Sequence, residues 1–172
     1  MAVDKPAGAD TAHAPAQPGK WRLGGALWLL GMPGVVAVVW ALLPTLKVNE
    51  ALLPMPLLVK LLYGGITEEL LMRWGVMTLL LWLGWRLLRR GHGQPRNGLV
   101  ATAVLFSAVL FAVGHLPAAQ AMAGELTMPV VAFVLVGNTV FGLLAGGLFA
   151  RHGLEAAIIA HVLAHLLASP LL

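Results

Sequence analysis

Long blocks of apolar residues alternate with short polar segments along most of the chain. A run of about 20 apolar residues is the length that an α-helix needs to cross a bilayer. The pattern therefore predicts an all-α fold, a polytopic membrane helix bundle with about five transmembrane helices. The expected spans cover residues 23–43, 66–88, 99–116, 129–150 and 154–167.

One apolar block, residues 51–88, is too long for a single simple span. Gly64 and Gly65 interrupt it, and Thr67 has a side chain that favours a helix N-cap. We expect residues 52–63 to be an interfacial or re-entrant segment, with the second span beginning after the two glycines. The alternative is that this segment crosses fully, which would move the following basic loop to the other side of the membrane.

The chain divides into a tail and one domain. Residues 1–20 are rich in Ala, Pro and Gly without periodicity, so we expect a disordered polar tail. Residues 21–172 are expected to form a single transmembrane helical domain. No segment is long enough to fold as a separate water-soluble domain.

Composition strengthens the membrane prediction and excludes several chemistries. Hydrophobic residues make up 59% of the 172 residues and charged residues only 10%, and the mean hydropathy is +0.87. A soluble domain of this size could not hide so much apolar surface. The chain contains no Cys, which excludes a thiol nucleophile, a disulfide, a thiolate zinc site and an iron–sulfur cluster.

The net charge of +4 arises from Lys and Arg residues that cluster at the ends of apolar blocks. This arrangement indicates membrane orientation rather than nucleic-acid binding. Lys20, Arg22, the Arg86–Arg96 cluster and Arg151 fall on one side of a five-span bundle. We therefore expect a multi-pass protein of the bacterial inner membrane with a cytoplasmic N-terminus and the lipid bilayer as its surroundings.

Ionisable side chains within the expected spans are costly and favour a functional interpretation. They are Glu68, Glu69, Arg73, His115, His161 and His165.

Glu69 and Arg73 lie one helical turn apart and can pair, whereas Glu68 is rotated by about 100° and need not share that pair. This predicts a supporting carboxylate neutralised by arginine beside a freer carboxylate that could activate water. The alternative is a helix cap with an ion pair that holds the bundle together.

Two further polar or small-residue patterns lie in the last two spans. His161 and His165 are four residues apart and share one helix face; a single histidine there would more often bond across helices. Asn138, Gly142 and Gly146 also repeat every fourth residue, and this stripe predicts close packing against another helix.

The residue inventory narrows the ways in which such a protein could hydrolyse a peptide bond. The only aspartates lie in the tail, and neither Ser107 nor Ser169 lies in a G-x-S-x-G turn. The pair His161 and His165 has no glutamate between its members, so an H-E-x-x-H zinc motif is absent. Glutamate and histidine with water as the nucleophile remain.

The motifs resemble those of one known superfamily. Residues 68–73 fit E-E-x-x-x-R, residues 111–115 fit F-x-x-x-H, and residues 161–165 are similar to H-x-x-x-N/H. This ordered set resembles the CAAX prenyl protease and bacteriocin-processing (CPBP, or ABI) superfamily of intramembrane glutamic endopeptidases. The resemblance covers about residues 52–170.

The resemblance implies a role for each residue of the set. Glu68 would activate water with help from His115, and His161 and His165 would stabilise the oxyanion. Glu69 and Arg73 would support the site, and no cofactor or metal is implied. The prenyl proteases have Asn where this chain has His165, which favours a different membrane-anchored protein or peptide as the substrate.

Two other hypotheses remain open from the residues alone. The first is a zinc-dependent membrane hydrolase with Glu68, His115, His161 and His165 as ligands. The second is a non-catalytic membrane protein, such as a bacteriocin immunity factor or a small proton-coupled carrier.

The expected topology also predicts the side on which cleavage occurs. The second span starts at the outer face, so Glu68 lies in its outer half, and His115 closes the third span at that same face. An outward-opening site suits an exported substrate with a C-terminal sorting or processing signal. In this respect the chain resembles the small myxosortase-like sorting proteases of the superfamily.

Overall fold

The computed structural model describes residues 37, 41 and 56–168, and every element between residues 56 and 168 is a helix. The predicted tail, residues 1–20, lies outside the described residues, as does nearly all of the first span. The helices are α2 (Leu57–Val59), η3 (Lys60–Glu68), η4 (Leu70–Met77), α3 (Thr78–Leu88), α4 (Asn97–Gly114), α5 (Leu116–Ala123), α6 (Met128–His152) and α7 (Leu154–Ala168).

The elements α2, η3, η4 and α3 follow one another without a break, so residues 57–88 form one continuous helical run. Its middle part has the wider π-helical turn, in which backbone bonds reach five residues back. The hydroxyl of Thr67 likewise donates to the carbonyl of Leu62, 3.1 Å away, and that of Thr78 donates to the carbonyl of Arg73, also at 3.1 Å.

The predicted interruption at Gly64 and Gly65 is therefore wrong, as is the N-cap at Thr67. Both glycines are buried within η3, where they pack against α7. The missing side chains allow close helix contact, and the two residues do not end the helix. Residues 57–63 accordingly belong to the same helical run as Glu68 and are not a separate segment; residues 52–55 lie outside the described part.

The close packing predicted from the small-residue stripe is confirmed for α4 and α6. A Cβ on Gly142 would lie 2.8 Å from Cα of Ala108, and a Cβ on Gly146 would lie 2.9 Å from Cγ1 of Val104. Asn138 instead donates from Nδ2 to the carbonyl of Val134 in its own helix, 2.9 Å away.

The third span, expected at residues 99–116, corresponds to α4, which ends at Gly114, and Pro117 follows it. This proline lies in the first turn of α5, where a missing backbone N–H is tolerated. Two helical stretches of the described part are long and apolar enough to cross a membrane, namely Asn97–Ala123, which joins α4 and α5, and Met128–His152. Helix α7 is apolar but shorter.

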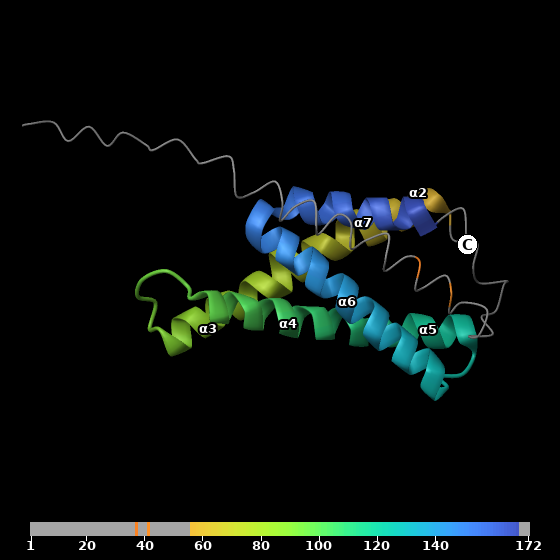
Figure 1. Ribbon diagram of the computed structural model, residues 1–172, viewed down its shortest axis with the longest axis horizontal. Coiled ribbons are helices and arrows are strands. Elements are labelled where there is room, and N and C mark those ends of the chain that lie inside the picture. The colour runs from red at the N-terminus through yellow and green to blue at the C-terminus, as the bar shows by residue number, and fades with distance from the viewer. Residues whose placement is uncertain (1–36, 38–40, 42–55, 169–172) are drawn as a thin grey trace, which may run out of the picture.

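The helical run of residues 57–88 packs against two other helices, α7 and α4 (Figure 1). Its first part, η3, packs along α7, and its later parts, η4 and α3, pack along α4. Helix α6 contacts both α4 and α7 and so joins the two halves. The side chains of Glu68 and Glu69 therefore arise where the long run passes from α7 to α4.

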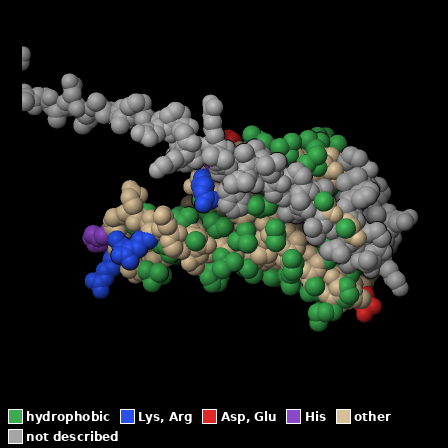
Figure 2. All heavy atoms as spheres, in the orientation of Figure 1, with side chains coloured by type: hydrophobic (Ala, Val, Ile, Leu, Met, Phe, Trp, Pro, Cys, Tyr) green, Lys and Arg blue, Asp and Glu red, His purple; other side chains and the backbone are tan. Residues whose placement is uncertain are grey.

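The distribution of side chains is reversed relative to a soluble protein. Large apolar residues such as Trp74, Phe106 and Met128 are 66%, 58% and 79% exposed, and hydrophobic side chains are spread over the visible described face (Figure 2). Glu69 and Arg73, in contrast, are fully buried. Such an arrangement suits a protein surrounded by lipid with a polar interior.

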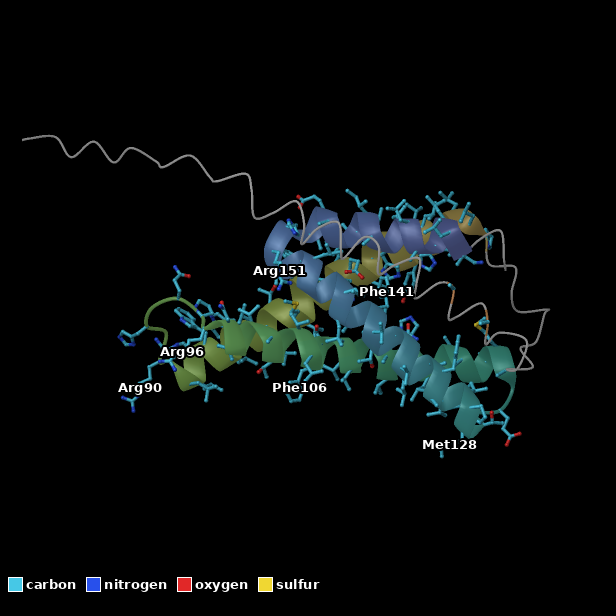
Figure 3. All side chains as sticks on the ribbon, viewed as in Figure 1. Arg90, Arg96, Phe106, Met128, Phe141 and Arg151 are labelled. Atoms are coloured by element: carbon cyan, nitrogen blue, oxygen red, sulfur yellow. The ribbon has the colours of Figure 1, made fainter. Side chains whose placement is uncertain are left out.

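Several basic residues at helix ends lie on the same side of the molecule. Arg90, Arg96 and Arg151 lie toward one end of the molecule and Met128 lies at the other (Figure 3). The basic loop between α3 and α4 turns through residues with positive φ angles, Arg90 at 50° and Gly91 at 75°. Arg90, Arg96 and Arg151 are among the basic residues from which the sequence analysis predicts the cytoplasmic side.

Candidate active site

A buried ion pair forms the base of the site. The Nε atom of Arg73 lies 2.9 Å from Oε2 of Glu69, and both side chains are 0% exposed. Nη2 of Arg73 lies 3.4 Å from Oε1 of the same carboxylate. The pairing expected from their spacing is confirmed, and it neutralises the carboxylate of Glu69.

The same carboxylate holds a histidine from a distant part of the chain. Oε1 of Glu69 lies 2.8 Å from Nδ1 of His161, which is buried on α7. Because an ionised carboxylate can only accept, Nδ1 carries the proton that makes this bond. Glu69 therefore orients the ring of His161 so that Nε2 faces the second glutamate.

Glu68 is the freer carboxylate of the two. Its side chain is 20% exposed, and Oε2 lies 3.8 Å from Nε2 of His115 and 4.0 Å from Nε2 of His161. Both distances exceed a direct hydrogen bond. Two histidine nitrogens thus lie within 4.0 Å of one carboxylate oxygen without a direct hydrogen bond to it.

His115 lies at the C-terminal end of α4 and is fixed by its own helix. Nδ1 donates to the carbonyl oxygen of Phe111, 2.8 Å away, because a carbonyl oxygen can only accept. In the neutral ring Nε2 then carries a lone pair, and this nitrogen lies 3.8 Å from Oε2 of Glu68. The break between α4 and α5 at this residue places the ring beside the long helix.

His165 lies one turn beyond His161 on α7 and stacks on it. The two ring centroids are 4.9 Å apart and the planes differ by 17°. Nε2 of His165 is buried and has no hydrogen-bond partner. It lies against Gly64 of η3, where a Cβ would overlap with it. The structure thus places His165 beside the site through His161.

Two phenylalanines enclose the polar groups, and Phe141 was missed by the sequence analysis. Its ring lies 4.4 Å from that of His161. Phe111 lies 4.4 Å from His115 and 5.2 Å from the guanidinium carbon of Arg73. Phe141 directly precedes Gly142 on α6, but its contact with His161 depends on how α6 packs against α7, and no sequence signal pointed to it.

All six residues singled out from the sequence are thus brought together from three parts of the chain. Within residues 56–168 no group of three or more His, Asp or Glu side chains is arranged to hold a metal ion.

Comparison with known proteins identifies the family. Residues 50–167 match the type II CAAX prenyl endopeptidase Rce1-like family. The chain belongs to this family. No curated protein and no solved structure matches the chain.

The match to the Rce1-like family covers the whole site from Glu68 to His165. The family indicates a hydrolase that cleaves proteins, and its members are membrane proteins, with which the two long apolar helices agree. The resemblance to the CPBP superfamily that the motifs suggested is confirmed.

Proposed function

We propose that this protein is an intramembrane endopeptidase of the glutamic type, located in the bacterial inner membrane. The observation that supports this most directly is the arrangement around Glu68. Its carboxylate faces Nε2 of both His115 and His161 within 4.0 Å, while the neighbouring Glu69 is neutralised by Arg73. One carboxylate is thereby left available for chemistry in an otherwise apolar bundle.

The attacking group is a water molecule held between Glu68 and His115. A gap of 3.8 Å between two acceptor atoms can be bridged by one water that donates a hydrogen bond to each. The water oxygen attacks the carbonyl carbon of the scissile peptide bond while Glu68 takes one of its protons. Phe111 and Phe141 limit the entry of further water around the histidines.

The histidines of α7 act on the developing oxyanion. Because Nδ1 of His161 bonds to Glu69, Nε2 of this ring donates a hydrogen bond only when the ring is protonated. The negative charge of the oxyanion favours that form. Collapse of the tetrahedral intermediate then breaks the C–N bond, and the proton held by Glu68 passes to the leaving amine. In His165, Nδ1 is the nitrogen that remains available, since Nε2 faces Gly64.

The substrate is a membrane-anchored protein with a C-terminal sorting or processing signal. Helix α4 begins beside the basic loop and ends next to His115. At about 1.5 Å per residue its 18 residues place His115 about 27 Å from that loop, near the far side of a hydrocarbon core about 30 Å thick. With the basic loop in the cytoplasm, the site opens toward the outer face, where exported proteins arrive.

Purified full-length protein in liposomes tests the activity. The probe is a reporter protein that ends in an apolar helix and a basic tail, and a quenched peptide with a prenylated cysteine near its end is the second probe. We expect cleavage of the reporter that is unaffected by 1,10-phenanthroline. Cleavage of neither probe would contradict the proposal, and inhibition reversed by added zinc would favour the zinc hydrolase. Cleavage of the prenylated peptide alone would change the substrate class.

The side of the membrane is tested with single cysteines, because the chain contains none of its own. Gln94 in the basic loop and Thr127 at the opposite end are both exposed. In intact cells an impermeant maleimide should label Thr127→Cys and leave Gln94→Cys unlabelled. The reverse pattern would place the site toward the cytoplasm.

A further inference from the structure

The contact between η3 and α7 has an unusual feature at Gly64. A Cβ at this position would overlap with Nε2 of His165, and the three nearest atoms are all from the His165 ring. The ring therefore occupies the space that any other residue at position 64 would fill. Its Nε2 atom is buried without a hydrogen-bond partner, so no bond compensates for this placement.

The ring of His165 in turn supports the ring of His161. The two stack at 4.9 Å with nearly parallel planes, and Phe141 contacts the His161 ring at 4.4 Å. His161 bonds to Glu69 through one nitrogen and faces Glu68 with the other. Displacement of His165 would therefore disturb the one ring that faces both carboxylates.

We propose that Gly64 is a positioning residue of the active site, whose missing side chain lets His165 lie flat against His161. This inference rests on the proposed function, because it takes His161 to act in hydrolysis. Gly64 and His165 then form a matched pair, since a residue larger than glycine at position 64 requires a shorter side chain at position 165. An asparagine at 165 would leave this space unoccupied.

The neighbouring Gly65 provides a matched control. It lies on the same helix and also packs against α7, but its Cβ would lie 2.6 Å from Cγ2 of Val162, which is an apolar side chain and not a histidine. Gly64→Ala and Gly65→Ala therefore both overpack the same helix contact, but only Gly64→Ala overlaps with the ring of His165. Val162→Ala relieves the overlap at Gly65 as His165→Asn relieves it at Gly64.

The experiment is a double-mutant cycle measured with the reporter protein in liposomes. Gly64→Ala should lower kcat on the order of 10- to 100-fold, because small displacements of reacting groups have effects of that size. In the His165→Asn background the same Gly64→Ala change should lower kcat by less than about 2-fold. Gly65→Ala should leave kcat within about 2-fold and lower only the melting temperature, which Val162→Ala restores. An unchanged kcat in Gly64→Ala, or a loss that His165→Asn does not relieve, would overturn the inference.

A second measurement does not depend on hydrolysis. In protein labelled with ¹⁵N-histidine, Gly64→Ala should shift the ring signals of both His161 and His165, whereas Gly65→Ala should leave them in place. If the unaltered chain cleaves neither probe, the proposed function fails, and these signals still decide whether Gly64 positions the rings. If Gly64→Ala does not accumulate as folded protein but Gly64→Ala/His165→Asn does, the rescue supports the pairing; failure of both to accumulate while His165→Asn alone does would contradict it.

Discussion

Two pairs of glycines bring helices close together in this protein, and they differ in what lies opposite them. Gly142 and Gly146 are four residues apart on α6 and face Ala108 and Val104 of α4. Gly64 and Gly65 are adjacent on η3, and one of them faces a histidine of the candidate active site. The first contact joins apolar surfaces, whereas the second also carries polar groups.

If the proposed mechanism holds, glycine serves packing at the α4–α6 contact and the placement of a site histidine at the η3–α7 contact. A spacing of four residues places small residues on one helix face, which is sufficient for helix association in lipid. Adjacent glycines do not form such a stripe, so their purpose depends on the side chains across the contact. We therefore expect changes in the α4–α6 contact to affect folding alone, and changes at Gly64 in the η3–α7 contact to affect hydrolysis as well.

The largest expected effect concerns the buried ion pair of Glu69 and Arg73. Glu69→Gln or Arg73→Ala leaves its partner as an uncompensated buried charge, which should lower the free energy of unfolding by about 3–5 kcal/mol. Melting in detergent measures this, with Glu125→Gln, an exposed acidic position, as the control. Normal melting together with lost hydrolysis would instead assign Glu69 and Arg73 to the reaction itself.

The next effect distinguishes two roles of His165 at the η3–α7 contact, which are donation of a hydrogen bond and support of the His161 ring. His165→Ala removes both a donor and the support for His161, and it should lower kcat by about 10²–10³. His165→Asn keeps a neutral donor and should retain more activity. Reporter cleavage per folded molecule gives the comparison. Equal rates for the two variants would show that position 165 serves packing alone.

A smaller effect is expected at the purely apolar contact. Gly142→Ala places a methyl group against the backbone of Ala108, which cannot move aside as a side chain can. Overpacking of this kind lowers stability by about 1–3 kcal/mol, and kcat per folded molecule should not change. Gly137→Ala on the same helix, where no atom lies within 4 Å of an added Cβ, is the control. A selective loss of kcat in Gly142→Ala would remove the distinction between the two contacts.

The smallest effect concerns the aromatic ring that links the two contacts. Phe141 lies next to Gly142 in sequence and touches His161 and Phe111. Phe141→Leu should lower stability by about 0.5–1.5 kcal/mol through loss of the aromatic pairs. Melting curves measure this change, and a reduced kcat in the same variant would show that the ring also holds His161 in place. A melting temperature equal to that of the unaltered protein would show that the ring contributes no such pairing.

Sequence reasoning singled out the residues of the candidate site because their chemistry conflicts with their surroundings. Charged groups such as Glu68 and Arg73 within apolar blocks are expensive, and four-residue spacing showed which of them share a helix face. The helical character of α4, α6 and α7 followed from the length of the apolar blocks. Residue spacing and block length can both be read along a single helix, so neither inference needed contacts between helices.

The features that sequence reasoning missed depend on contacts between helices. Gly64 and Gly65 suggested a break because glycine is a poor helix former, but burial against α7 outweighs that propensity. The contact of Phe141 with His161 depends on how α6 crosses α7, which no spacing along a single helix reveals.

The most direct test of the central claim is the reporter cleavage rate of Glu68→Gln. The substitution preserves size and removes the base, so turnover should fall by a factor of 10² or more if Glu68 activates water, in the range typical of general-base catalysis. Melting and the ring signals of His115 and His161 show whether the variant is folded, and Glu125→Gln again serves as the exposed control. Loss of cleavage in a folded protein is the predicted result. Near-normal cleavage by a folded Glu68→Gln protein would contradict the account and remove Glu68 from the mechanism.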